Sequence, residues 1–364
     1  MRALPLQQKN EMMVKLIAPA LDRVARSDWI SLPGDIGNHS RILVIDSGSL
    51  TELLFFSPVI KQLKSKFPEM RVSFLVREGN SELIRMIQQI NEMISYEPSH
   101  LTLTSTTYFS LLKRLRQRDF NVVFLLGREF NFARSLLALI TKAKIRVGFS
   151  QEFTYPFINC ELRCSDDTSY EATRALSFLN AIGFGRDTQL PRWNLPEQDI
   201  RWARRMIHFR KPSKEIKLLA VDPGVGKGGH RLVDESFAYL VNDFCRRYPA
   251  KVLALSNNLE SKGLERFKSL IVADLLGLQP ANIKEGIALL SCADLMISGN
   301  TDYFHFAVNM NIPTIGLFTR HDDSKWLPRG TPWVQILQGV KGQQLSLEEF
   351  FSKIDTLFHL AGVK

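Results

Sequence analysis

The sequence predicts an α/β protein built from two Rossmann-like domains, each with a doubly wound parallel sheet. Short buried strands alternate with longer helices, a pattern that is typical of parallel sheets. This alternation runs twice along the chain, first from Arg41 and again from Lys217. Between the two runs lies a stretch with Pro191 and Pro196, where we expect a domain junction. Two such domains are expected to face a cleft, with the strand ends directed toward it.

The elements of the first half follow from short apolar runs bounded by polar turns and from apolar residues at helical spacing. Strands are predicted at residues 41–46, 71–76, 121–126 and 146–149, and helices at residues 53–66, 81–89, 109–118 and 132–141. Pro68 ends the first of these helices. Helices at residues 170–182 and 198–210 flank the junction, which is rich in Arg and Lys.

The second half repeats the pattern. Strands are predicted at residues 217–222, 251–256, 295–298 and 314–318, and helices at residues 234–248, 283–291, 305–310 and 346–360. The last helix begins with a capping box at residues 346–349.

The chain length fits two domains with additions at both ends. Its 364 residues suffice for two domains of ordinary size. We expect an N-terminal helical extension at residues 1–40, domains at residues 41–195 and 196–345, and a C-terminal helix at residues 346–364. The extension has an amphipathic helical pattern, which fits either packing on its own domain or contact with a membrane surface.

The composition narrows the class of partner. A net charge of +10 favours anionic partners such as nucleic acid, anionic lipid or phosphorylated sugar. The chain has no zinc-finger spacing and no aromatic RNA-binding signature, which argues against nucleic acid. No apolar run reaches membrane-spanning length, and the N-terminus does not resemble a secretory signal. With only four scattered cysteines, a cytoplasmic protein with reduced thiols is expected.

Two turns in the second half have the character of phosphate sites. One is the polar turn at residues 299–302, between a buried strand and a helix that carries His305. Free N–H groups and the helix dipole favour an anion there. The other is the glycine-rich turn at residues 223–231, whose glycines let backbone N–H groups approach phosphate. Lys227 lies within this turn and is our first choice for the cation.

The glycine-rich turn also fits the dinucleotide pattern G-x-G-x-x-G, so a nicotinamide-dependent oxidoreductase is an alternative. The next strand ends in Leu255-Ser256-Asn257-Asn258, without the acid that would bind a ribose. The sequence therefore argues against this alternative, and we expect no cofactor.

Five segments in the same order resemble glycosyltransferase family 9, the bacterial ADP-heptose:lipopolysaccharide heptosyltransferases, over residues 41–360. The segments are RILVIDSGSLTELLFFSPVIKQLKSKFP, Arg146-Val-Gly148, Val221-Asp-Pro-Gly224, LLSCADLMISGNTDYFHFAVNMNIPTIGLF and Trp326-Leu-Pro328. The resemblance implies a GT-B fold and inverting, metal-independent sugar transfer, with the nucleotide sugar held mostly by the second domain. The absence of an Asp-x-Asp pair agrees with a reaction without metal.

The resemblance also implies the partners and the base. The donor would be a nucleotide-diphosphate sugar, ADP-heptose first, and the acceptor an anionic glycolipid, the phosphorylated inner core of lipopolysaccharide. The enzyme would then work in the cytoplasm, at the surface of the inner membrane. The family's catalytic Asp corresponds to Glu52, which follows Gly48, Ser49 and Thr51 in the first turn. The alternative interpretation of Glu52 is a favourable acid in the first turn of a helix.

The remaining correspondences concern the donor. Gly224, Gly226 and Lys227 of the glycine-rich turn are candidate donor contacts. In the family correspondence, the phosphate-binding Lys falls on His230, and Glu260 matches a Glu that contacts the ribose. The family's Asp-Thr-Gly-x-x-His segment reads here as Asn300, Thr301, Asp302 and, at its end, His305. Glu260 also fits a solvated loop and His305 a core position.

The chain departs from the family at the base, at the phosphate-binding Lys and at the Asp-Thr-Gly segment. A carboxylate at Asp302 would repel a diphosphate unless it turns away. An inert GT-B scaffold that serves as a binding or assembly protein is therefore the second hypothesis.

Overall fold

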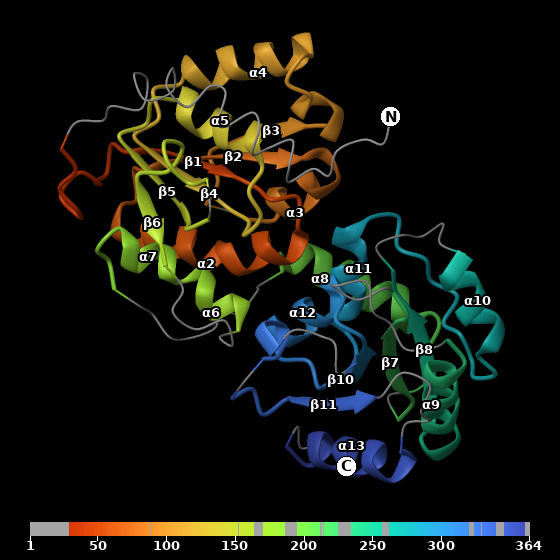
Figure 1. Ribbon diagram of the computed structural model, residues 1–364. Helices are drawn as coiled ribbons and strands as arrows, with labels where there is room; N and C mark the ends of the chain where they lie inside the picture. The colour runs from red at the N-terminus through yellow and green to blue at the C-terminus, as the bar shows by residue number, and fades with distance from the viewer. Residues whose placement is uncertain are drawn as a thin grey trace, which may run out of the picture. The chain divides into compact units, whose positions relative to one another are not determined.

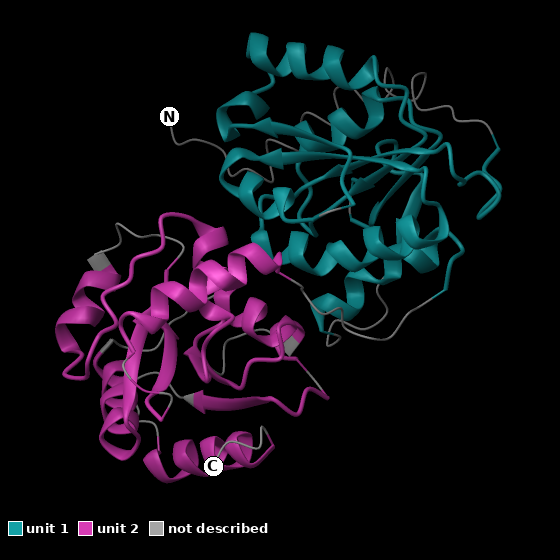
Figure 2. Cartoon of the chain, turned by 180° about the vertical axis from the view of Figure 1, so that it is seen from behind, with its two compact units in different colours: residues 1–189 teal, residues 190–364 magenta. Residues whose placement is uncertain are grey.

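Two parallel β-sheets, one in each half of the chain, organise the structure, which is a computed structural model (Figures 1 and 2). The chain divides into two compact units, residues 1–189 and residues 190–364. The structure describes residues 29–87, 89–151, 153–163, 170–185, 195–211, 213, 215–224, 234–256, 262–319, 324–328, 330–339 and 346–360. Residues 1–28 of the expected N-terminal extension lie outside the described residues. The predicted domain limits stay a prediction.

The sheet of the first unit has the strand order β3-β2-β1-β4-β5-β6, and its pairings are parallel. Its strands are β1 (Arg41–Ile45), β2 (Arg71–Arg77), β3 (Glu92–Tyr96), β4 (Val122–Leu125), β5 (Ile145–Phe149) and β6 (Cys160–Leu162). Its helices are α2 (Leu50–Lys66), α3 (Ser81–Arg85), α4 (Thr106–Arg116), α5 (Phe132–Ile140), α6 (Glu171–Ala175) and α7 (Ser177–Ala181).

Helices cover both faces of this sheet because the side chains of β1 alternate between them (Figure 1). Leu43 and Ile45 of β1 belong to a buried cluster with residues of α4 and α5. On the other face, Phe56 of α2 packs edge-on against Phe124 of β4 and Phe178 of α7. A doubly wound first unit results.

The sheet of the second unit has the order β11-β10-β9-β7-β8 and is also parallel. Its strands are β7 (Lys217–Asp222), β8 (Ala250–Ala254), β9 (Leu295–Ser298), β10 (Thr314–Thr319) and β11 (Val334–Gly339). Its helices are α8 (Glu197–His208), α9 (Asp234–Arg247), α10 (Lys262–Leu270), α11 (Ile283–Leu290), α12 (Asp302–Asn309) and α13 (Leu347–Leu360).

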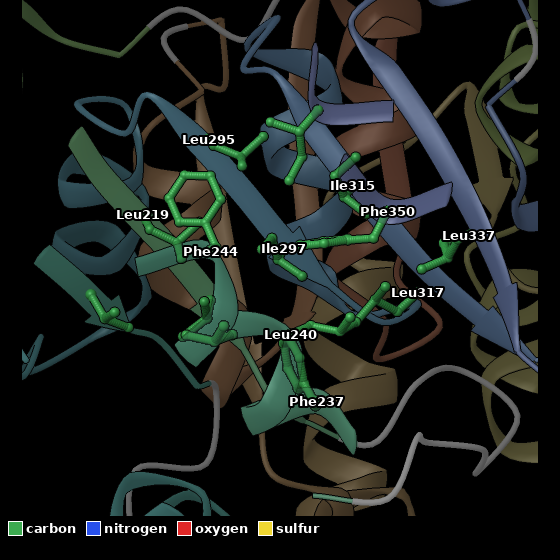
Figure 3. Packing of buried hydrophobic residues seen from close by; sticks show 14 of the residues in the cluster. Leu219, Phe237, Leu240, Phe244, Leu295, Ile297, Ile315, Leu317, Leu337 and Phe350 are labelled. Atoms are coloured by element: carbon green, nitrogen blue, oxygen red, sulfur yellow. The ribbon is translucent and has the colours of Figure 1, made fainter. Parts of the chain in front are cut away.

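The main core of the second unit lies between one face of this sheet and helices α9, α10 and α13 (Figure 3). Leu219, Ile297 and Leu317 point from three strands toward Phe244 of α9 and Phe350 of α13. Helices α8, α11 and α12 pack against one another in the same unit. Two Rossmann-like units with helices around parallel sheets confirm the predicted fold class.

Several elements differ from those predicted. The helix expected at residues 81–89 ends at Arg85, and β3 follows it. The helix expected at residues 170–182 is two short helices, α6 and α7. Helix α12 begins at Asp302, before the predicted start at His305, because Thr301 accepts a hydrogen bond from the backbone N–H of Phe304 and caps it. Strands β3, β6 and β11 and helix α10 have no counterpart in the prediction.

Close contact between α11 and α12 requires a glycine. A Cβ atom added to Gly286 of α11 would lie 2.0 Å from the hydroxyl oxygen of Tyr303 in α12. Tyr303 is fully buried, so its ring has no free space to enter. This packing holds the first turn of α12 in place.

We therefore expect Gly286→Ala to destabilise the protein by about 1–3 kcal/mol through overpacking. Urea unfolding followed by circular dichroism measures the change. Gly79→Ala is the matched control, since a Cβ atom there meets nothing within 4 Å. Equal stability of the two variants would contradict this account of the α11–α12 contact.

Candidate functional site

The candidate donor site lies where the second sheet reverses its strand order, between β7 and β9. In open α/β sheets, ligands bind beyond the carboxyl ends of the strands at such a point. The last residues of the two strands, Asp222 and Ser298, are register partners. The turns that follow them therefore begin side by side.

These two turns are the ones in which the sequence predicts phosphate contacts. A Cβ atom added to Gly224 would lie 3.5 Å from the Thr301 methyl group, so the turns are in contact. The backbone N–H of Gly224 donates to Asp222 Oδ1 at 2.8 Å, and the hydroxyls of Ser298 and Thr301 are 2.8 Å apart. The structure thus brings together Gly224, Thr301 and the first turn of α12.

Asn300 and His305 lie behind this turn in the interior. His305 is fully buried, and its Nε2 is 2.9 Å from Asn300 Oδ1. Its ring lies edge-on to Phe304 and tilted against Trp326. Asn300 is also buried, and its Nδ2 has no hydrogen-bond partner among the described residues. The geometry makes His305 a support for the turn, while its predicted part in donor binding stays a prediction.

Asp222 is the electrostatic centre of this site. Burial raises the pKa of its carboxyl from the ordinary 3.8 to about 7. Hydrogen bonds from Thr301 and from the Gly224 N–H lower the pKa, and the nearby carboxylate of Asp302 raises it. Asp302 itself is partly buried at the start of α12. The position where a diphosphate is predicted is therefore flanked by two acidic side chains.

The candidate base lies at the corresponding point of the first sheet. The order β3-β2-β1-β4 reverses between β1 and β4, and the chain leaves β1 through Gly48, whose φ is +90°. Ser49 then caps α2 by accepting a hydrogen bond from the backbone N–H of Glu52. Thr51 is buried, and Glu52 stands in the first turn of the helix.

Glu52 lines a pocket in the first unit, with about 340 Å³ of empty space including its open mouth. Gly127, one of its lining residues, lies close to the end of β1, because a Cβ atom there would be 2.9 Å from the Ser47 Cβ. Aromatic side chains make up much of the wall. The lining residues are Glu52, Phe55, Phe56, Leu126, Gly127, Arg128, Phe149, Glu171, Ala175 and Phe178.

Charged residues of this pocket were missed by the sequence analysis. Arg128 Nε lies 3.3 Å from Glu171 Oε1, and Arg174 donates to the same oxygen at 3.1 Å. The Glu171 side chain is only 9% exposed, so a buried carboxylate holds two arginines. The Gly-Arg pair directly after β4 was the available signal, because strand ends at a switch point carry ligand contacts.

A second missed residue, Asp46, fixes the end of β1. Its carboxylate is buried and accepts hydrogen bonds from the Arg77 N–H, from Asn80 and from Tyr96. Burial raises the pKa of this carboxyl, which these hydrogen bonds partly offset. The network anchors the turn that leads into α2.

Four predicted donor residues lie outside the described residues, namely Gly226, Lys227, His230 and Glu260. Across the described part of the chain, no group of three or more His, Cys, Asp and Glu side chains could hold a metal ion.

Two Rossmann-like units, each with predicted site residues at its switch point, define an α/β protein with the architecture of the nucleotide-binding class. Residues 108–350 match the family model described as glycosyltransferase family 9 (heptosyltransferase). The chain belongs to this family and is a glycosyltransferase of the heptosyltransferase type, which favours sugar transfer over the oxidoreductase alternative.

Individual relatives agree with this assignment. The chain is 24% identical over 281 residues to the lipopolysaccharide core heptosyltransferase OpsX of Haemophilus influenzae, covering 74% of this chain and 76% of the relative. The glycosyl transferase family 9 structure from Veillonella parvula has a TM-score of 0.74 at 16% identity, covering 89% of this chain and 99% of that one. The E. coli ADP-heptose lps heptosyltransferase II has a TM-score of 0.69 at 13% identity, covering 88% and 99%. The structural matches establish the GT-B fold.

We expect the carboxyl of Asp222 to make stability depend on pH. Its pKa is about 7 in the native state, compared with 3.8 for an ordinary Asp carboxyl as in the unfolded chain. Between these two pH values the native state therefore binds more protons than the unfolded state. Its contribution to the free energy of unfolding then falls by about 1.4 kcal/mol per pH unit from pH 4 to pH 7 and levels off above.

Urea unfolding of the natural protein and of Asp222→Asn at pH 5, 6, 7 and 8 measures this difference. The natural protein should lose its advantage over the variant as the pH rises toward 7. Asp274→Asn, at an exposed position paired with Lys251, is the control. A difference between natural protein and Asp222→Asn that does not change with pH would contradict the buried, protonated carboxyl.

Proposed function

We propose that this glycosyltransferase moves heptose from ADP-heptose to a lipopolysaccharide-core acceptor, with inversion and without a metal ion. The printed names of OpsX and of heptosyltransferase II support this donor and this acceptor. The observation that carries the proposal is the contact between the Gly224 turn and Thr301 at the β7–β9 switch point. There, the backbone N–H groups of a turn and of a helix start can receive a diphosphate.

The donor would rest its diphosphate on the turn at Gly224 and on the first turn of α12. The N–H groups and the dipole of α12 stabilise the negative charge that grows on the leaving diphosphate. We also assign Gly226, Lys227, His230 and Glu260 to the donor, on the sequence correspondence alone, because they lie outside the described residues. Asn300 and His305 support the turn from the interior.

The acceptor would present its hydroxyl to Glu52 in the pocket of the first unit. In the reaction the hydroxyl oxygen bonds to the anomeric carbon, the bond from that carbon to the diphosphate breaks, and the hydroxyl proton passes to the Glu52 carboxylate. Gly48, Ser49 and Thr51 shape the turn that places this carboxylate. An anionic glycolipid acceptor would bring the protein to a membrane surface, and among the described residues no helix is long and apolar enough to cross one.

We expect Glu52→Gln to lower the rate of heptose transfer by about 10²–10⁴-fold, because the amide cannot take the proton. The affinity for ADP should stay within about twofold, because removing the base does not alter the N–H groups of the second unit. A transfer assay and calorimetry with ADP measure the two effects. Glu69→Gln, at an exposed position of the first unit, is the matched control. Unchanged turnover in Glu52→Gln would rule this base out.

The acidic pair Asp222 and Asp302 favours the second hypothesis, an inert scaffold, because both carboxylates oppose a diphosphate. Calorimetry separates the two. A glycosyltransferase that uses this site binds ADP and ADP-heptose, whereas a scaffold gives no heat with either at millimolar concentration.

We expect Asp302→Asn to raise the affinity for ADP about fivefold at pH 7.5, since it removes one charge beside the leaving group and keeps the shape of the side chain. The variant should also lower the pKa of Asp222, because the charge of Asp302 raises that pKa in the natural protein. Asp119→Asn changes the net charge equally from an exposed position in the first unit and should leave the affinity unchanged. Weaker ADP binding in Asp302→Asn would show that Asp302 assists the donor.

A further inference from the structure

Helix α8 presents an outward face made of arginines. The helix packs on its own unit through Ala203 and Ile207, which are buried, and lies against α11. The opposite face is exposed and carries cations one turn apart, at Arg201, Arg204 and Arg205, with His208 continuing it. Three guanidinium groups thus share one strip of surface.

The charges of this strip are not neutralised. None of Arg201, Arg204 and Arg205 has an ion pair with any residue that the structure describes. Two other exposed helical arginines do pair with acids, Arg85 with Glu82 and Arg246 with Asp243, whereas Arg114 and Arg116 of α4 have no ion pair among the described residues.

Three acids lie near this strip, and Glu197, exposed on α8 one turn before Arg201, adds one negative charge to the same face. Asp199 on α8 is already paired with Lys284 of α11, at 3.0 Å. Asp294 is paired with Lys211, which follows α8, at 3.6 Å. With three arginines against Glu197, the strip keeps a net positive charge toward solvent.

An exposed aromatic side chain borders the same strip. Phe209, directly after α8, is 81% exposed, and the partly exposed Trp202 lies seven residues earlier, on the same side of the helix. A single exposed aromatic residue needs no explanation. An aromatic flank beside an arginine face is, however, the composition of helices that lie in a membrane interface, with rings in the headgroup region and cations on the phosphates.

We propose that the face of α8 formed by Arg201, Arg204, Arg205 and Phe209 docks the protein on an anionic phospholipid surface. Charge complementarity selects an anionic partner, and the position of the ring at the flank of an amphipathic helix is the arrangement of helices in a bilayer interface. The inference rests on the proposed function in one respect, that a glycolipid acceptor lies in a membrane. The docking itself needs neither donor nor acceptor.

Vesicle flotation with the full chain tests the proposal, without ADP-heptose or lipopolysaccharide. Vesicles of phosphatidylglycerol and phosphatidylcholine in equal parts should bind the protein, and pure phosphatidylcholine vesicles should not. Each arginine near an anionic surface strengthens binding about fivefold, so the triple variant R201Q/R204Q/R205Q should bind roughly a hundredfold more weakly. Raising the salt concentration from 0.1 M to 0.5 M should weaken binding of the natural protein.

The matched control is K113Q/R114Q/R116Q, which removes the same charge from three exposed positions of α4 in the first unit. It should bind vesicles like the natural protein, and Phe209→Ala should weaken binding several-fold without changing its salt dependence. Equal loss in both triple variants would overturn the proposal in favour of a general effect of net charge. Binding to single-stranded DNA that is lost with the α8 arginines, with no binding to vesicles, would assign the face to nucleic acid.

Circular dichroism of the triple variants confirms that they fold, so that lost flotation reports the surface. Failure of docking in an enzyme that still transfers heptose to a detergent-solubilised acceptor would overturn this inference alone. Failure of transfer by a protein that floats with vesicles would overturn the proposed function alone.

Discussion

The parallel pairing of β7 with β9 is the constraint on which the candidate donor site depends. Because Asp222 and Ser298 end these strands in register, the turns after them must start at the same height on the sheet edge. The helices that follow are α9, in the main core, and α12, which packs with α11. The described starts of the two connections, at Gly224 and Thr301, therefore lie side by side at a switch point, the place where open α/β sheets bind ligands.

Two electrostatic effects oppose each other at this site: the dipole of α12 attracts an anion, and the carboxylates of Asp302 and Asp222 repel it. The start of a helix is worth about half a positive charge, and an acid in its first turn already uses part of this field. Asp302 occupies that place in α12, and Asp222 lies buried behind it. The balance favours an anion more as Asp222 gains its proton, which its pKa of about 7 allows near neutral pH. Burial of one acid therefore moderates the repulsion that the substitution of glycine by Asp302 introduces.

Much of the architecture could be predicted because central strands of parallel sheets are apolar on both faces. β1, β7 and β9 are continuous apolar runs followed by polar turns, and each was predicted to within a residue. The edge strand β3 could not be, since Glu92–Tyr96 is short, lacks a clear alternation of polar and apolar residues and follows a helix that was predicted too long. The ion pair between Arg128 and Glu171 could not be predicted from the sequence either. The two residues are far apart in the chain and meet only because α6 packs on α2.

The start of α2 bears on the two interpretations of Glu52, which both stay predictions. An acid in a first turn contributes most where the N–H groups need a partner, yet the Ser49 hydroxyl already accepts the N–H of Glu52. The carboxylate is therefore not the cap of α2, and it lines a pocket whose wall is aromatic and whose mouth is open. Arg128 stands in the same pocket, held by the buried Glu171. Glu52 and a cation fixed in place thus line one pocket, which is the geometry that a proton-accepting base requires.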